Sequence, residues 1–186
     1  MDPLVPAFVA VLLAGVGDRP ALLAAILADR HGRGATIAGI VAQAIGFGVA
    51  AAAGALVAPH LTPNARNLLL ALALLSAGGS ALVAARIRDR LDHWRLPGWL
   101  TGLLGMAILA FGDRGQFLVF ALVARTPDPV AGAVGSTLAA GALSAAAATL
   151  GERGWLALPL RRVRPVVGGL LLIAGAVLGL GALRLL

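Results

Sequence analysis

Long apolar runs separated by short polar segments make up almost the whole chain. A helix needs roughly 20 mostly apolar residues to cross a bilayer. Six runs are about that long when proline, glycine and arginine are taken as breaks. We therefore predict an all-α integral membrane protein with six transmembrane helices. The predicted spans are Leu4–Ala28, Ala35–Ala58, Ala65–Ala85, Gly98–Ala124, Val130–Leu150 and Val166–Leu183.

The composition supports a membrane protein. Of 186 residues, 60% are hydrophobic and only 12% are charged, whereas about a quarter of a typical soluble domain is charged. A chain this short and this apolar has too little polar surface to cover a soluble globule. It has no cysteine, which excludes disulfides and thiolate metal sites.

The formal net charge of +7 comes from arginines that are unevenly distributed between the predicted loops. Three lie on one side of the membrane, and the first, third and fifth loops on the other side hold ten: Arg30, Arg33, Arg86, Arg88, Arg90, Arg95, Arg153, Arg161, Arg162 and Arg164. Basic loops stay in the cytoplasm, so we expect loop 86–97 to be cytoplasmic and both termini to lie outside. The excess of arginine then reflects how the protein is oriented in the membrane and the contact of its loops with anionic lipid headgroups. It does not indicate nucleic-acid binding.

A charged tripeptide occurs twice. Gly17-Asp18-Arg19 recurs 95 residues later as Gly112-Asp113-Arg114. Each half holds three predicted spans, an odd number, so the second half must enter the membrane from the opposite side. Such inverted repeats underlie many secondary transporters. We predict a first repeat at 1–85, a cytoplasmic linker at 86–97 and a second, inverted repeat at 98–186.

Four charged residues fall inside the predicted spans: Asp18, Arg19, Asp113 and Arg114. Placing each charge at the bilayer centre costs at least about 2.5–3.5 kcal/mol of insertion free energy, so such residues usually have a functional role. Neighbours in a helix point about 100° apart, which makes crossed pairs more favourable: Asp18 with Arg114, and Asp113 with Arg19. Ion pairs that only lock the bundle are the alternative. Gln116, beside the second motif, is the polar residue most suited to join them. Weaker candidates in the other spans are Gln43, Ser76, Ser80, Ser136, Thr137 and Ser144.

The segments Ala14–Pro20 and Leu109–Gln116 resemble the duplicated signature of the Gdt family of membrane cation/proton exchangers. That family includes bacterial manganese exporters and Golgi calcium/manganese transporters. Its signature reads Glu-x-Gly-Asp-(Lys/Arg)-(Ser/Thr), once in each half. The matching positions here are Gly17, Asp18, Arg19, Gly112, Asp113 and Arg114, with Gln116 as a common extension.

The two signature glutamates are absent. Their positions hold Gly15 and Ala110, and the hydroxyl positions hold Pro20 and Gly115. Two acids therefore face two bases, with a formal sum of zero. The small residues are expected to leave space where the glutamate side chains stood, for water, backbone carbonyls or another substrate.

The resemblance implies a secondary-active transporter that exchanges Mn²⁺ or Ca²⁺ for protons by alternating access, in a bacterial inner membrane. Asp18, Asp113 and Gln116 would bind the ion, and Arg19 and Arg114 would act as counter-charges or gates. No resident cofactor is expected, the partners are the lipid bilayer and the transported ion, and the oligomeric state is open. Two alternatives remain: the same fold carrying a small anion or zwitterion, and a non-transporting membrane subunit. An enzyme is not expected, because the sequence offers no nucleophile–His–acid set.

Overall fold

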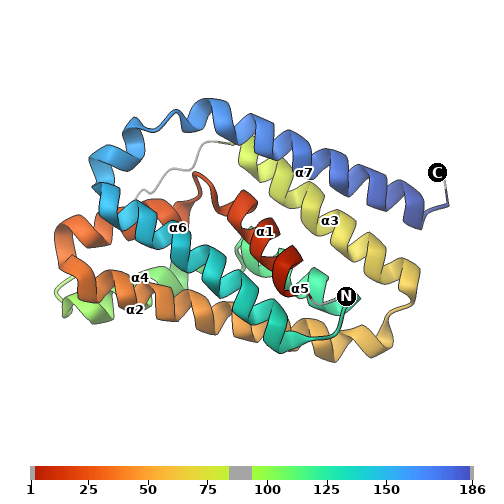
Figure 1. Cartoon of the computed structure of the whole chain (residues 1–186). Helices are drawn as coiled ribbons and strands as arrows, with labels where there is room; N and C mark the ends of the chain where they lie inside the picture. The colour runs from red at the N-terminus through yellow and green to blue at the C-terminus, as the bar shows by residue number, and fades with distance from the viewer. Residues whose placement is uncertain (1–2, 84–93, 185–186) are drawn as a thin grey trace.

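The protein is described here by a computed structural model covering residues 3–83 and 94–184, and the regular elements within these ranges are helical (Figure 1). In chain order they are α1 Leu4–Gly15, α2 Arg19–Val57, the 3₁₀ turn η1 Ala58–His60, α3 Pro63–Leu82, α4 Gly98–Ala110, α5 Arg114–Arg125, α6 Pro129–Ala157 and α7 Leu160–Ala182. Most of the predicted linker 86–97, including Arg86, Arg88 and Arg90, lies outside the described residues.

The duplicated motif forms the same helix break in both halves. α1 ends just before the first motif and α2 starts within it; α4 and α5 are related in the same way, 95 residues later. The two turns contain Gly17 with φ +70° and Gly112 with φ +69°, a left-handed conformation that glycine adopts without a steric penalty. Asp18 and Asp113 are the N-caps of the helices that follow. The predicted spans Leu4–Ala28 and Gly98–Ala124, which contain the two acids, are therefore each interrupted at the acid.

The predicted count of six spans is not confirmed. By length and composition four of the described helices could cross a membrane, or five if α4 and α5, bent by 64°, form one span. The range Arg19–Val57 joins two helical segments that meet at a kink at Gly32, where φ is +77° and ψ is −177°, and the two segments together make up one of the four candidates. The kink lies within the predicted break at 29–33 between the first and second predicted spans. α1, with 12 residues, is too short to span alone.

The predicted break at 151–165 is also shorter than expected. α6 bends at Gly151, where φ is +69°, but continues to Ala157, and α7 already begins at Leu160. Pro165 lies inside α7 rather than before it. Arg164, which the sequence analysis counted among the loop arginines, is therefore a helical residue.

Equivalent helices of the two halves pack against each other. α2 lies along α6, and α3 lies along α7, while the short helices α1 and α5 contact each other between these pairs (Figure 1). Glycine permits close approach at the crossings. A Cβ added to Gly102 would lie 2.0 Å from the carbonyl oxygen of Ala35, and one added to Gly175 would lie 3.0 Å from that of Ala71.

The outer surfaces of the helices carry large apolar side chains. Ile37, Leu56, Val130 and Ile173, for example, are each more than 60% exposed. The buried positions are rich in alanine and other small residues. This distribution, with large apolar groups outside and small ones inside, suits a helical bundle surrounded by lipid.

Candidate ion-binding site

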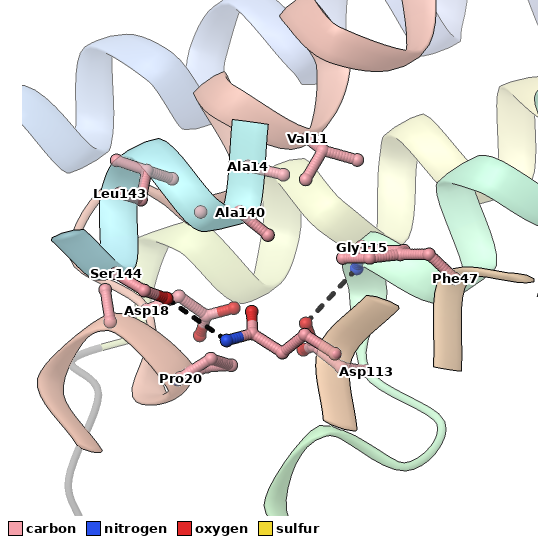
Figure 2. Close-up of a pocket in the computed structure, with 13 residues that line it drawn as sticks. Val11, Ala14, Asp18, Pro20, Phe47, Asp113, Gly115, Ala140, Leu143 and Ser144 are labelled. Carbon is pink, nitrogen blue, oxygen red and sulfur yellow. Dashed lines mark hydrogen bonds between the residues drawn. The ribbon is translucent and has the colours of Figure 1, made fainter. Parts of the chain in front are cut away.

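The two motif acids line one small cavity. Asp18 and Asp113, contributed by the two helix breaks, border a space of about 30 Å³ among α1, α2, α5 and α6 (Figure 2). A cavity of this size has room for at least one water molecule. Apolar groups such as Val11 and Phe47 form much of its wall, and none of the residues that line it is basic.

Asp18 forms the crossed ion pair that the sequence predicts. Its Oδ2 accepts a hydrogen bond from Nε of Arg114 at 3.0 Å, and its side chain is 13% exposed. Its Oδ1 accepts from the backbone N–H of Arg19 at 2.8 Å, as an N-cap does. Both carboxylate oxygens therefore have a donor in this conformation.

The second crossed pair is not formed. Among the ion pairs between described residues, none joins Asp113 to Arg19. Arg19 is exposed, while Oδ2 of Asp113 accepts from the backbone N–H of Gly115 at 3.4 Å. The two halves have the same backbone break but place their charged side chains differently.

Arg114 is held from two sides. Besides the pair with Asp18, its Nη1 donates to Oγ of Ser80 at 3.1 Å, and Ser80 in turn donates to the carbonyl of Ala77. The Arg114 side chain is only 8% exposed. Its Nη2 is buried and has no hydrogen-bond partner among the described residues. One donor of this guanidinium is therefore left for another acceptor.

Two neutral polar side chains complete the wall of the small cavity. Gln43 of α2 and Ser144 of α6 are buried, and Nε2 of Gln43 donates to Oγ of Ser144 at 3.1 Å (Figure 2). The sequence analysis gave both as candidates to join the motif charges, but ranked them below Gln116. Both positions fall outside the duplicated motif, and the residues 95 positions away, Leu138 and Val49, are apolar.

Gln116 lies elsewhere. Its Oε1 accepts a hydrogen bond from the backbone N–H of Gly112 at 3.1 Å, and its amide packs on Gly46, where an added Cβ would lie 2.3 Å from Nε2. It is not among the residues lining the small cavity. In this conformation Gln116 stabilises the second motif turn, and ion binding by it remains a prediction.

A leucine side chain lies close to Gly15. A Cβ added there would lie 2.5 Å from Cδ1 of Leu143, so an apolar side chain from α6 occupies the position next to the first absent glutamate. Ala110, at the second glutamate position, is buried as well. Gly15 nevertheless lines the small cavity, and the expectation that water, a carbonyl or a substrate occupies the space left by the glutamates stays a prediction.

Arg164 is a site residue that the sequence analysis missed. It packs on the first motif turn, where a Cβ added to Gly17 would lie 2.9 Å from its Cδ, and its Nη2 donates to the carbonyl of Val83. It lines a second cavity together with Arg19 and Arg114. The repeat gave no signal for it, since the residue 95 positions earlier is Leu69.

No resident metal centre is evident in the part of the chain described, which contains no group of three or more His, Asp or Glu residues that could hold a metal ion. The arrangement instead offers two carboxylates, an amide and a hydroxyl around a space with room for at least one water molecule. Carboxylates can exchange a cation for protons. For Asp18 this requires that Arg114 release it.

A helical membrane bundle built from two copies of a broken-helix unit, with an acid at each break, defines the class of membrane transporters with internal repeats. The family model for the divalent cation/proton antiporter GDT1 matches residues 3–89 and 98–184, nearly the whole chain in two copies. The chain belongs to the GDT1 family, which is a family of transporters rather than enzymes. No curated protein and no solved structure matches it.

Proposed function

We propose that this protein exchanges a divalent cation for protons, with the cation held between Asp18 and Asp113. The observation that carries the proposal is the small cavity on which both motif acids open, opposite the neutral oxygens of Gln43 and Ser144. Oxygen ligands of this kind suit hard divalent cations. The antiporter description of the family supports the same reaction class.

Of the two cations expected, we propose Mn²⁺ as the better fit. Ca²⁺ takes 6–8 oxygen ligands in a flexible shell, and the side-chain oxygens around the cavity come from four residues only: Asp18, Asp113, Gln43 and Ser144. Leu143 narrows the site further beside Gly15. A smaller ion that binds through fewer protein oxygens meets these limits more easily.

Arg114 serves as the internal counter-charge in this mechanism. With the cation absent it neutralises Asp18 across 3.0 Å. An arriving cation takes its place at the carboxylate, and Arg114 keeps its hydrogen bond to Ser80. Protons that reach Asp18 and Asp113 from the other side of the membrane displace the cation in turn, which couples the two fluxes.

Movement of the two halves against each other would expose the acids to one side and then the other. We propose that 1–85 and 98–186 form inverted repeats joined by a cytoplasmic linker at 86–97, in a bacterial inner membrane with both termini outside. The turns at Gly17 and Gly112, both at positive φ, are suited to act as hinges. The pairs α2 with α6 and α3 with α7 are surfaces along which the halves could slide.

Transport in proteoliposomes tests the proposal. Protein reconstituted with a Mn²⁺-quenched dye inside is given external Mn²⁺ and an outward proton gradient. We expect quenching that depends on the gradient and is abolished in the Asp18→Asn, Asp113→Asn double variant. Asp128→Asn is the matched control, because Asp128 is also a helix N-cap but is exposed and outside the cavity.

Each other result points to a definite alternative. Gradient-driven Mn²⁺ flux that persists in the double variant would refute the assigned roles of the two acids. Flux of a small anion without Mn²⁺ flux would favour the anion reading, which the three arginines of the second cavity support. Absence of both fluxes in folded protein would indicate the non-transporting subunit.

A further inference from the structure

The second cavity has a different character from the first. Its volume is about 470 Å³, and it shares Asp18 and Asp113 with the small cavity. Its remaining wall carries three guanidinium groups, those of Arg19, Arg114 and Arg164. The two acids thus lie between a small cavity that no basic residue lines and a larger cavity that is lined by three arginines.

Two hydrogen-bond donors on the arginine side lack acceptors. Nη2 of Arg114 and Nε of Arg164 are buried and have no hydrogen-bond partner within the described residues. The Arg114 side chain as a whole is only 8% exposed. A buried donor without an acceptor is unfavourable and uncommon. Guanidinium donors are arranged in a planar fork that matches the oxygens of carboxylate, sulfate or phosphate.

The charges at this cavity do not balance. Three arginines face two aspartates, and Asp18 is already paired with Arg114. In addition, α2 begins at Arg19 and α5 begins at Arg114, so two helix N-termini with their partial positive charge open on the same space. The excess of positive charge and the donors without acceptors both favour the binding of an anion.

We propose that the cavity lined by Arg19, Arg114 and Arg164 binds a small oxyanion, and that the bound anion draws Arg114 away from Asp18. Since a water molecule occupies about 30 Å³ of liquid, a volume of about 470 Å³ holds such an ion with several waters. Anion binding itself is independent of cation exchange. Its consequence rests on the proposed function: the released Asp18 carboxylate becomes available to the cation.

Thermal unfolding of the purified full chain in neutral detergent, without divalent cations, tests the site. Sodium sulfate is compared with sodium chloride at equal ionic strength. We expect sulfate to raise the unfolding midpoint by several degrees in a saturable manner. Arg164→Gln should remove most of this shift, whereas the control Arg162→Gln should keep it, because Arg162 is exposed and does not line the cavity.

A second variant guards against misfolding, since Arg164 also contacts Gly17 and the carbonyl of Val83. Arg19 is exposed, so Arg19→Gln should fold normally and still weaken the sulfate response. Equal effects of sulfate and chloride would overturn the proposal if anionic lipid, tested below, does not stabilise the protein either. An equal loss in Arg162→Gln would overturn it as well.

The oxyanion could be a free ion or the phosphate of a lipid headgroup. Nanodiscs of phosphatidylcholine and of phosphatidylglycerol separate these sources. Stabilisation by sulfate in detergent assigns a free anion. Stabilisation only in phosphatidylglycerol, lost in Arg164→Gln and retained in Arg162→Gln, assigns a headgroup at the same site. No response to either source in the wild type refutes the site.

The link to the cation is measured by titrating Mn²⁺ with and without saturating sulfate. Coupled sites typically change each other's affinity by about 5–150-fold, and we expect sulfate to tighten Mn²⁺ binding about fivefold. Unchanged Mn²⁺ affinity with intact sulfate binding would refute the coupling through Arg114. A normal sulfate response without any Mn²⁺ binding would instead refute the proposed cation exchange and leave the anion site standing.

Discussion

The ion pair between Asp18 and Arg114 makes a quantitative prediction for stability. Arg114→Gln leaves the carboxylate of Asp18, 13% exposed, with the backbone N–H of Arg19 as its remaining donor. Removing one partner of a buried pair costs about 3–5 kcal/mol. The retained hydrogen bond and the residual exposure place the expected loss near the lower limit, about 3 kcal/mol. Asp18→Asn should cost less, because Arg114 keeps Ser80.

The double variant Asp18→Asn, Arg114→Gln buries no unpaired charge, so its loss should be smaller than the sum of the single losses. We expect a coupling energy of about 2 kcal/mol, within the range found for residues in direct contact. Reversible unfolding in SDS mixed micelles, followed by far-UV circular dichroism, gives the four free energies. The same cycle on Asp113 and Arg19 is the internal control, since these residues form no ion pair in the described structure. Equal coupling in both cycles, or none in the first, would refute the pairing.

Two further predictions concern small residues. Gly102→Ala should destabilise the bundle by more than about 1 kcal/mol despite the better helix propensity of alanine, because its Cβ would lie 2.0 Å from the carbonyl oxygen of Ala35; Gly79→Ala, with nothing within 4 Å of the added Cβ, should be neutral or stabilising in the same unfolding assay. Gly15→Glu combined with Leu143→Ala should tighten Mn²⁺ binding in calorimetry, since it adds a carboxylate and removes the methyl group 2.5 Å from the new Cβ. Unchanged affinity in that folded double variant would argue against a cation at this position.

The features that the sequence predicted well are those set by local chemistry and by duplication. The duplicated tripeptide placed Asp18 and Asp113 at equivalent positions of the two halves, where each acid caps the helix that follows a break. The pairing of Asp18 with Arg114 followed from helix geometry and the cost of an unpaired charge. The equivalent pair of Asp113 with Arg19 is not formed, because a repeated sequence does not require equivalent side chains to adopt the same rotamers.

The features that the sequence did not predict depend on contacts between distant segments. Leu143 lies against Gly15 only because α6 packs on α1 at this position. Arg164 reaches the motif because α7 starts at Leu160, five residues before the proline that was taken to mark a loop. None of these outcomes has a signature in local composition.

The central claim is that a divalent cation binds between the two motif acids. Crystals of the protein grown with Mn²⁺, measured above and below the manganese absorption edge, test it most directly. The account predicts an anomalous difference peak in the cavity within ligand distance of Asp18 and Asp113, with Arg114 displaced from the carboxylate it now contacts at 3.0 Å. An occupied Mn²⁺ site elsewhere on the chain, with this cavity empty and the Asp18–Arg114 pair intact, would contradict it.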